Sequence, residues 1–268
     1  MNNDFSGNIE RFTGFAEQYD KYRPSPPSAL ADLLMRLAGT SRPALVVDLG
    51  SGTGLSSRYW ADKAEQVIGV EPTLDMRKQA EAQTDAKNVI YQEGFSHQTG
   101  LPNHCAQIVT CSQSLHWMEP QSTFEEAVRI LTPGGVFAAY DYDWPPTTGN
   151  WEADAAYGKC MTKIREMANG DIDPNPIRMW EKPQHLSRIH KSGCFQYTKE
   201  IVIHHIEPGN AERLIGLLRS QGSVMTLLKG GLSESQIGID IFRQKVLEAL
   251  GMEFKPWYWS SRVRIGIA

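Results

Sequence analysis

Residues 44–54, ALVVDLGSGTG, constrain the fold more than any other part of the chain. The run of aliphatic and β-branched residues before the acid is typical of a parallel strand that is buried on both faces. Gly50, Gly52 and Gly54 let the chain turn tightly while its backbone approaches a ligand. The pattern therefore predicts a buried strand that leads into a loop, and a small polar molecule against that loop.

The acidic residue before the loop indicates which ligand this is. Loops that bind dinucleotides read G-x-G-x-x-G and leave a helix N-terminus free for a pyrophosphate, whereas this loop reads D-x-G-x-G-x-G. Asp48 brings a carboxylate that disfavours a phosphate and favours an ammonium group, such as that of S-adenosylmethionine. A second apolar strand, 66–71, ends in Glu71, which can accept both hydroxyls of a ribose. NAD would use Glu71 equally well.

Five strings in succession carry a resemblance to a known family. They are VVDLGSGTG (46–54), IGVEP (68–72), GFSHQTGLP (94–102), CSQSLHWMEP (111–120) and RILTPGGVFAAYDYD (129–143). Their order and spacing resemble the motifs of class I S-adenosylmethionine-dependent methyltransferases. Within that superfamily, SQSLHW and the N-terminal YDKYRP are most similar to the small-molecule branch that includes trans-aconitate methyltransferase-like enzymes. The likeness covers about residues 9 to 141.

The resemblance implies a Rossmann-like α/β fold, in which a mostly parallel seven-stranded sheet ends in an antiparallel strand and carries helical cap insertions. The alternation of strand and helix patterns also predicts a parallel sheet with its ligand at the carboxyl ends of the strands. Residues 1–143 are expected to form an N-terminal arm and the cofactor-binding core, and 144–268 the rest of the sheet with substrate-binding insertions, all in one structural domain. Helices are expected at 9–23, 28–38, 54–63, 73–83, 121–131, 151–168, 182–192, 210–220 and 233–250, and the later strands at 88–91, 106–112, 135–141, 197–206 and 257–267.

The resemblance assigns roles to individual residues as well. The backbone from Gly50 to Gly54 would flank the methionine part of S-adenosylmethionine, Asp48 would face its ammonium and Glu71 would hold its ribose. The further residues implied in cofactor binding are Tyr19, Arg23, Ser51, Pro72, Met76, Phe95, Ser96, Ser112 and Gln113. Many relatives have a carboxylate for the adenine amino group at the position of Phe95, so here Phe95 would stack on the ring and Ser96 would bond to it.

His116, just after the fourth strand, is the candidate general base. Imidazole titrates near neutral pH and can take a proton from a hydroxyl. A second interpretation remains open, in which His116 only hydrogen-bonds a loop or a water molecule while Trp117 packs beside it.

The composition excludes several classes of binding partner. A formal net charge of −4 without any basic run argues against a nucleic-acid surface. The four cysteines are far apart and the histidines lack zinc-finger spacing, which indicates free thiols and no metal site. The sequence shows neither a leader nor an apolar run of membrane-spanning length. We therefore expect a cytoplasmic protein without a membrane partner. A homodimer is possible.

These observations favour an enzyme that transfers a methyl group from S-adenosylmethionine to a small-molecule acceptor, with an oxygen as the favoured target. An alternative of another class is a catalytically silent protein of the same fold that binds the cofactor and acts as a regulator. An NAD-dependent dehydrogenase conflicts with Asp48 and with the spacing of the glycines.

Overall fold

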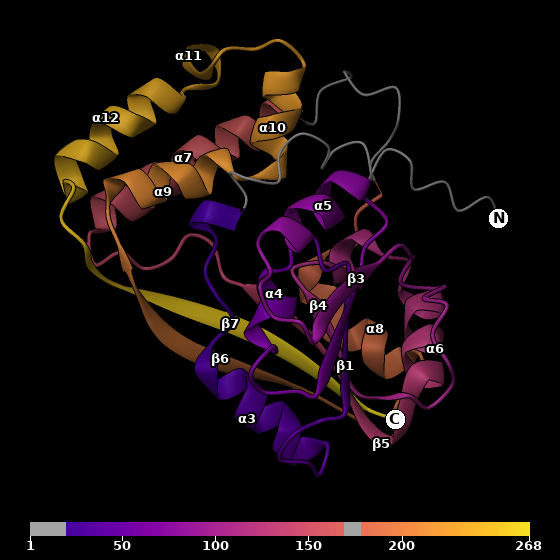
Figure 1. Ribbon diagram of the computed structural model, residues 1–268. Coiled ribbons are helices and arrows are strands. Elements are labelled where there is room, and N and C mark those ends of the chain that lie inside the picture. Colours follow the sequence, from indigo (N-terminus) through magenta and orange to yellow (C-terminus); the bar gives the residue numbers. More distant parts are fainter. Residues whose placement is uncertain (1–19, 169–177) are drawn as a thin grey trace. The chain divides into compact units, whose positions relative to one another are not determined.

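The computed structural model describes residues 20–168 and 178–268 (Figure 1). This part of the chain divides into two compact units. The core unit consists of residues 25–142, 178–203 and 261–268. The helical unit consists, within the described residues, of 20–24, 143–168 and 204–260. Both units are therefore assembled from segments that are distant in the sequence.

One seven-stranded sheet has the strand order β3-β2-β1-β4-β5-β7-β6. Its strands are β1 (Leu45–Leu49), β2 (Gln66–Val70), β3 (Val89–Gln92), β4 (Ala106–Ser112), β5 (Leu131–Tyr142), β6 (Tyr197–Gly209) and β7 (Lys255–Ile267). The pairs among β1 to β5 are parallel, and β7 runs antiparallel to β5. The predicted α/β fold, with a mostly parallel sheet and an antiparallel last strand, is confirmed.

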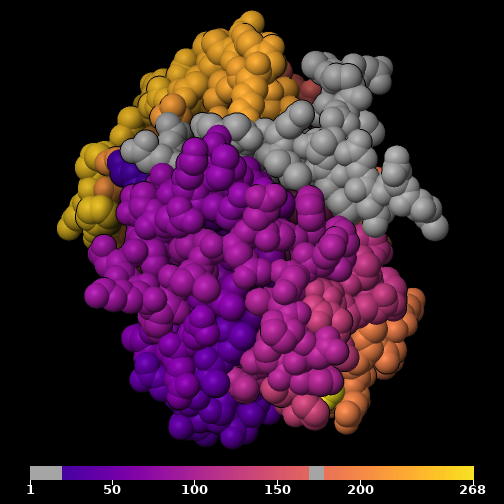
Figure 2. All heavy atoms as spheres, turned by 45° about the vertical axis from the view of Figure 1, so that its right-hand side comes forward, coloured from indigo at the N-terminus to yellow at the C-terminus, as the bar shows by residue number. Residues whose placement is uncertain are grey.

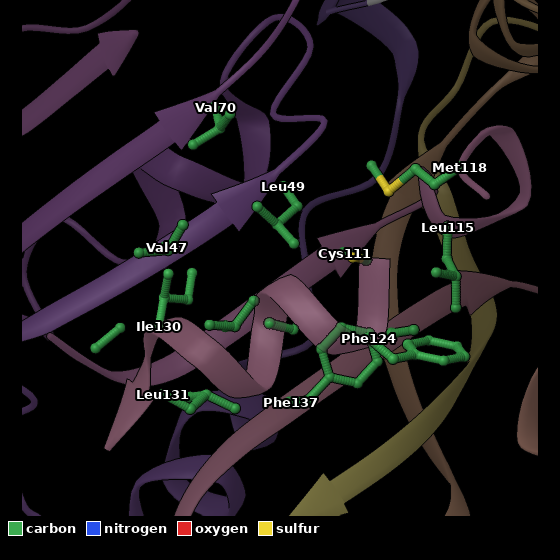
Figure 3. Close-up of a cluster of buried hydrophobic side chains, with 14 of the residues drawn as sticks. Val47, Leu49, Val70, Cys111, Leu115, Met118, Phe124, Ile130, Leu131 and Phe137 are labelled. Carbon is green, nitrogen blue, oxygen red and sulfur yellow. The ribbon is translucent and has the colours of Figure 1, made fainter. Parts of the chain in front are cut away.

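Helices cover both faces of the sheet in the core unit. They are α3 (Ser28–Leu37), α4 (Leu55–Tyr59), α5 (Leu74–Ala82), α6 (Pro120–Ile130) and α8 (His185–Lys191), with the 3-10 turns η1 (Leu115–Trp117) and η2 (Lys182–Gln184). Adjacent residues of β1 point to opposite faces, so Val46 packs with Leu30 of α3 and Trp60 after α4, whereas Val47 belongs to the cluster that contains Phe124 of α6 (Figure 3). Both layers are apolar, which explains the continuous aliphatic run of β1.

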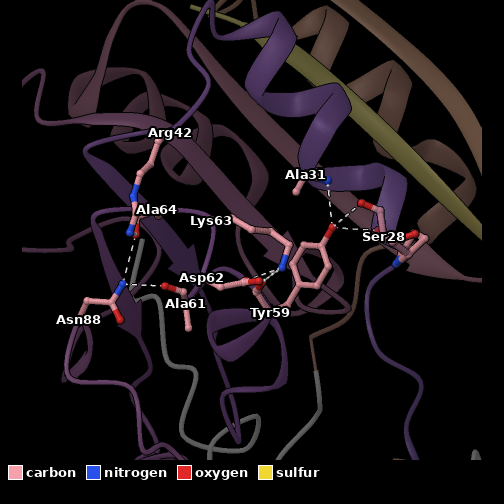
Figure 4. Close-up of polar contacts among 10 residues, drawn as sticks. Ser28, Ala31, Arg42, Tyr59, Ala61, Asp62, Lys63, Ala64 and Asn88 are labelled. Carbon is pink, nitrogen blue, oxygen red and sulfur yellow. Dashed lines mark hydrogen bonds and ion pairs between the residues drawn. The ribbon is translucent and has the colours of Figure 1, made fainter.

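Polar contacts tie α3 to α4 (Figure 4). The Tyr59 hydroxyl accepts a hydrogen bond from the Ala31 N–H at 2.9 Å and lies 2.9 Å from the Pro27 carbonyl oxygen. A residue of α4 thus bonds to backbone groups at the start of α3. Just before β3, the Asn88 side chain donates to the carbonyl oxygens of Ala61 and Ala64, which follow α4. The chain from α3 to β3 is therefore held by side chains that bond to backbone groups.

The helical unit contains α7 (Trp151–Ala168), α9 (Ala211–Arg219), α10 (Gly222–Lys229), α11 (Glu234–Ile237) and α12 (Ile239–Leu250). Helices α9 to α12 lie in the chain between β6 and β7, within the part of the sequence, 144–268, where helical insertions are expected. The single helix expected at 233–250 is wrong, because Gly238 adopts φ 88° and ends α11 before α12 begins. Helix α10 was not predicted from the sequence.

Other element boundaries differ less. Helix α4 ends at Tyr59, short of the predicted 63, and the segment predicted as a helix at 182–192 begins with η2 before α8. Residues 9–19 of the predicted N-terminal arm lie outside the described residues. In the space-filling view, residues of the first half of the core unit, coloured indigo to magenta, make up most of the face that comes forward (Figure 2).

Candidate active site

The loop after β1 turns on three glycines in the left-handed region. Gly50, Gly52 and Gly54 have φ values of 64°, 54° and 83°. A Cβ added to Gly50 would overlap the side chain of Met118, and one added to Gly54 would overlap Tyr91, whereas one added to Gly52 would meet no atom within 4 Å. Two of the glycines therefore allow close packing, and the middle one leaves its backbone open to a ligand.

Glu71 follows β2 and binds this loop. Its Oε2 accepts a hydrogen bond from the Gly52 N–H at 3.0 Å, and its Oε1 accepts one from the Thr73 N–H at 2.9 Å. The Gly50 N–H donates to the carbonyl oxygen of Val70 at 2.8 Å, which fixes the loop against the end of β2. The Thr73 side chain bonds to this carboxylate as well. Two carboxylate oxygens have about four acceptor positions, so Glu71 retains capacity for a hydroxyl donor. Burial raises the pKa of Glu71 above its ordinary value.

The Asp48 carboxylate is fully buried on β1 and is held by hydroxyl groups. Its Oδ1 accepts from Thr110 at 2.8 Å and from Ser56 at 3.2 Å, and its Oδ2 accepts from Ser57 at 2.8 Å. Burial raises the pKa of Asp48 to about 6, although the three hydroxyl bonds oppose the rise, and the nearby Glu71 adds to it. Two acids thus give the loop a negative environment, which suits a cationic ligand.

The predicted adenine and ribose residues belong to the core unit. Phe95 is 37% exposed, and its ring lies 5.4 Å from that of His97. The Ser96 hydroxyl is buried and lies 2.8 Å from the Thr123 hydroxyl on α6. Pro72 is half-buried, and Met76 on α5 is buried. Phe95 therefore has an accessible ring face, whereas the Ser96 hydroxyl already has a partner within the protein.

Of the two cofactor-binding residues predicted in the N-terminal arm, the structure describes only Arg23. Tyr19 lies outside the described residues. Arg23 belongs to the helical unit, where its guanidinium donates to the Ser220 carbonyl oxygen at 2.6 Å and to the Ser220 hydroxyl at 3.0 Å. The same guanidinium lies 4.8 Å from the Trp144 ring centroid. Arg23 is therefore anchored by the residue that follows α9 and by an aromatic face, and its role in cofactor binding remains a prediction.

The carboxyl end of β4 holds a strained residue. Ser112 ends the strand, and Gln113 adopts φ 53°, which is uncommon outside glycine and concentrates at functional sites. The Gln113 Oε1 accepts from the Lys182 Nζ at 2.8 Å. Its Nε2 is buried without a hydrogen-bond partner within the described residues. An oriented amide donor is therefore available where β4 ends.

His116 lies in η1, directly after this strand end, and is 7% exposed. Its carbonyl oxygen accepts from the Trp180 N–H at 2.9 Å, and its ring lies 4.6 Å from the Trp117 ring. The Nδ1 atom lies 3.9 Å from Oδ1 of Asp141 at the end of β5. A histidine whose one nitrogen faces a carboxylate has the arrangement that general bases use.

Sequence reasoning missed Asp141, which faces this histidine, and Lys182, which contacts Asp141. Asp141 is 5% exposed and receives Lys182 Nζ on Oδ1 at 2.8 Å and Arg264 Nη1 on Oδ2 at 2.7 Å. These cations lower the pKa of Asp141 to about 2 in spite of its burial. The signal for Asp141 was an acid at the end of an otherwise apolar strand, whereas no local pattern marks Lys182.

In chemical terms, one edge of the core unit combines a loop for a cationic ligand, a carboxylate for hydroxyl groups and a histidine beside an acid. Within residues 20–168 and 178–268, no three His, Cys, Asp or Glu side chains are grouped as a metal site would require. The same residues include no helix with the length and apolar character needed to span a bilayer.

Comparisons with known proteins agree with this geometry. Residues 47–139 match a family model described as a methyltransferase domain. The malonyl-[acyl-carrier protein] O-methyltransferase of Pseudescherichia vulneris is 37% identical over 124 residues, 46% of this chain and 48% of that protein. The yeast protein CRG1, described as a probable S-adenosylmethionine-dependent methyltransferase of Saccharomyces cerevisiae, is 27% identical over 146 residues, 53% of this chain and 50% of that protein. The chain thus spans about half the length of the curated relatives it matches.

A solved structure agrees over nearly the whole chain. A protein of Anaeromyxobacter dehalogenans, described as a presumed type II methyltransferase, superposes with a TM-score of 0.66 at 22% identity, covering 92% of this chain and 98% of that chain. The likeness at this level of identity is one of fold.

Proposed function

We propose, from the match of residues 47–139 to a methyltransferase domain, that this chain transfers a methyl group from S-adenosylmethionine to an oxygen of a small-molecule acceptor. The observation that carries the proposal is the contact between the glycine loop and Glu71, in which the Gly52 N–H donates to the carboxylate at 3.0 Å. It joins the backbone that would approach the methionine part to the acid that would hold the ribose.

The residues of the loop region fit the charges of this cofactor. When bound, S-adenosylmethionine supplies a methyl group on a positively charged sulfur, which leaves as a neutral thioether. Asp48 and Glu71 provide negative potential for the sulfonium and ammonium groups. Glu71 would accept a ribose hydroxyl, the open backbone at Gly52 would border the methionine part, and Phe95 would pack on the adenine.

His116 would act as the base toward a hydroxyl acceptor. The acceptor proton would pass to Nε2, since Nδ1 faces Asp141. Buried groups such as the Gln113 amide would orient the acceptor and exclude water. A carboxylate acceptor has no proton to lose and would need no base. The second interpretation, in which His116 only hydrogen-bonds a loop or a water molecule while Trp117 packs beside it, predicts no loss of turnover when His116 is replaced.

The acceptor class and the partners belong to the same proposal. The name of the Pseudescherichia relative, an O-methyltransferase, supports oxygen as the target, and the branch similar to trans-aconitate methyltransferase supports a small molecule. The net charge of −4 supports a protein without a nucleic-acid partner, and the free thiols of Cys105, Cys111, Cys160 and Cys194 support a reducing compartment such as the cytoplasm. Residues 1–143 would carry the cofactor, and the insertions in 144–268 would select the acceptor. Whether the chain forms a homodimer would be tested by light scattering of the purified protein.

Formation of S-adenosylhomocysteine with panels of hydroxyl, carboxylate and amine acceptors tests the proposal. His116→Gln should lower turnover of a hydroxyl acceptor by about 100-fold or more, with little change in cofactor affinity. His190→Gln is the matched control, because His190 is exposed on α8. Cofactor binding without turnover of any acceptor class would contradict the enzymatic proposal and favour a silent, regulatory protein of the same fold.

A further inference from the structure

The Asp48 carboxylate is enclosed by the protein. Asp48 is 0% exposed, and the hydroxyl groups of Ser56, Ser57 and Thr110 donate three hydrogen bonds to its two oxygens. Because it has no accessible surface, Asp48 offers no atom for direct contact with a ligand at the glycine loop. Its negative charge can act on such a ligand only through the groups that lie between them.

Ser56 on α4 extends the contacts of Asp48 toward β4 and β5. Its hydroxyl oxygen lies 3.2 Å from the Asp48 Oδ1 and 2.5 Å from the hydroxyl oxygen of Tyr140 on β5. The Tyr140 hydroxyl also bonds to the side chain of Ser112, the last residue of β4. Ser112 and Tyr140 are paired in the register of the two strands, so their side chains lie on the same face of the sheet. We call these four residues, Ser112, Tyr140, Ser56 and Asp48, the hydroxyl chain.

The single hydrogen on each hydroxyl sets the direction of every bond in the hydroxyl chain. An ionised carboxylate only accepts hydrogen bonds, so Ser56 uses its one hydrogen toward Asp48. Tyr140 must then donate to Ser56, because the contact between the two hydroxyls needs a hydrogen. Tyr140 has no second hydrogen, so Ser112 must donate to Tyr140. The Ser112 oxygen therefore offers only lone pairs to a ligand.

The opposite direction is unfavourable while Asp48 is ionised. Ser56 would then donate to Tyr140 and turn a lone pair toward the carboxylate oxygen 3.2 Å away, and these two negative groups repel each other. Burial raises the pKa of Asp48 to about 6, so this carboxylate is ionised at pH 8. Burial raises the pKa of Tyr140 well above its ordinary value, so its hydroxyl keeps its hydrogen. Hydrogen bonds in such a chain polarise one another, which makes the Ser112 oxygen a stronger acceptor.

Ser112 lies at the end of the hydroxyl chain that is nearest to the glycine loop. Its strand, β4, is the neighbour of β1 in the sheet. Just beyond it, the Ser114 hydroxyl donates to the Leu49 carbonyl oxygen at 2.7 Å, and a Cβ added to Gly50 would lie 2.8 Å from the Ser114 Cβ. Ser112 is half-buried, whereas the other three members of the chain are buried. The accessible end of the chain is therefore beside the loop that would border the methionine part of the cofactor.

We propose that Tyr140 is a positioning residue for cofactor binding, and that the hydroxyl chain presents the charge of Asp48 to the cofactor ammonium through the Ser112 oxygen. This inference rests on the proposed function. An ammonium group has three donors and no acceptor, so it matches an oxygen that offers only lone pairs. The cofactor carboxylate only accepts hydrogen bonds, and the same oxygen would repel it. The hydroxyl chain therefore also sets which way round the methionine part binds.

Calorimetric titration of the full chain at pH 8 tests this inference, with S-adenosylhomocysteine and its analogue without the amino group as the two ligands. The ratio of their dissociation constants, analogue over S-adenosylhomocysteine, reports the contribution of the ammonium to binding. Ser112→Ala removes the acceptor oxygen and should lower this ratio by about 10-fold, as expected for a hydrogen bond to a charged group. Tyr140→Phe frees the Ser112 hydrogen to turn toward the ligand and should lower the ratio by about 3- to 10-fold.

Two further variants separate the hydroxyl chain from general effects of substitution. Tyr140→Phe in the Ser112→Ala background should change the ratio no further, because Tyr140 acts on the ligand only through Ser112. Tyr59→Phe is the matched control, since it removes a buried phenolic hydroxyl that bonds to backbone groups at the start of α3 and lies outside the chain. It should keep the ratio of the parent.

If Tyr140→Phe does not fold, Ser56→Ala breaks the chain at its next bond and should lower the ratio in the same way. An unchanged ratio in the folded variant, or an equal further loss in the double variant, would overturn the inference while the parent still binds S-adenosylhomocysteine. A parent protein that binds neither ligand would contradict the proposed function and this inference together. The two failures are therefore distinguishable.

Discussion

Asp48 and Asp141 are buried carboxylates on strands of the same sheet, and their surroundings are opposite. Asp48 is 0% exposed and its partners within the described residues are the hydroxyls of Ser56, Ser57 and Thr110. Asp141 is 5% exposed and contacts two cations. Burial raises the pKa of Asp48 to about 6, whereas the cations lower that of Asp141 to about 2. Hydroxyl groups hold a buried charge in place without neutralising it.

This difference separates the roles of the two acids. The negative potential at Asp48 is not balanced by a cation of the described chain, so a cationic ligand that arrives at the loop gains from it. The charge of Asp141 is already matched by Lys182 and Arg264, so it serves the orientation of groups inside the protein. We infer that Asp48 favours a cationic ligand at the loop, whereas Asp141 orients side chains within the protein.

The largest effect should come from Asp141→Asn. This change leaves Arg264 and Lys182 beside a neutral amide, and removing one partner of a buried ion pair costs about 3–5 kcal/mol. Urea unfolding at pH 7 measures the loss in the free energy of unfolding. Asp62→Asn is the control, because Asp62 pairs with Lys63 with its own side chain 79% exposed, and should have little effect. Equal stability of the two variants would contradict the assignment of Asp141 as a buried anchor.

Asp48→Asn should change the pH dependence of stability. The pKa of Asp48 rises from an ordinary value near 4 to about 6 on folding. The native state therefore keeps this proton up to a higher pH than the unfolded chain does. Stability should therefore fall by up to about 3 kcal/mol as pH rises from 4 to 6 and stay level above. The variant should lose this fall, whereas Asp85→Asn at an exposed position should keep it. Identical profiles would show that Asp48 is not the group that titrates.

Glu71→Gln tests whether the Glu71 carboxylate contributes to cofactor binding. In the described structure, no cationic side chain contacts its carboxylate oxygens. The amide keeps one acceptor oxygen, so one of the bonds from Gly52 and Thr73 is lost along with the charge. We expect cofactor affinity to fall by about 10- to 100-fold, since hydrogen bonds to charged groups contribute about 1.5–3 kcal/mol. Calorimetric titration measures the affinity. Glu93→Gln, at a side chain that is 74% exposed, should bind like the parent.

Ser57→Ala should have the smallest effect on stability of these variants, and it tests whether hydroxyl groups stabilise the charge of Asp48. It removes one hydroxyl that stabilises the ionised Asp48 at 2.8 Å, so the pKa of Asp48 should rise further. Stability at pH 7 should fall by about 1 kcal/mol. Carbonyl-stretch infrared difference spectra of the protein follow this carboxyl group directly. A pKa for Asp48 that moves down in the variant would contradict the account of hydroxyl bonding.

Much of the fold could be predicted because its signals are local. The aliphatic run before the glycine loop fixes β1, and the predicted bounds of β4 and α7 match the structure. The break at Gly238 was missed because buried Ile237 and Ile239 continue an apolar pattern across it. Helix α10 begins at Gly222, a residue that disfavours helix interiors.

The polar network around His116 could not be predicted in the same way. Asp141 and Lys182 are brought together by tertiary structure, since η2 and β5 are separated in the chain by α7. No spacing in the sequence encodes that contact. In the glycine loop, by contrast, the acid Asp48 and the ligand-facing backbone at Gly52 are only a few residues apart. The sequence alone therefore indicates a ligand there.

The most direct test of the central claim is calorimetric titration of the purified protein with S-adenosylmethionine, S-adenosylhomocysteine and NAD. Gly52→Arg would place a side chain where the loop is open, and Gly39→Arg is its matched control, because Gly39 has a similar φ of 65° and the same free space around its Cβ position. We predict that the first two ligands bind, that NAD does not, and that Gly52→Arg alone abolishes binding. Binding of NAD alone, or undiminished binding of S-adenosylmethionine by Gly52→Arg, would contradict the account.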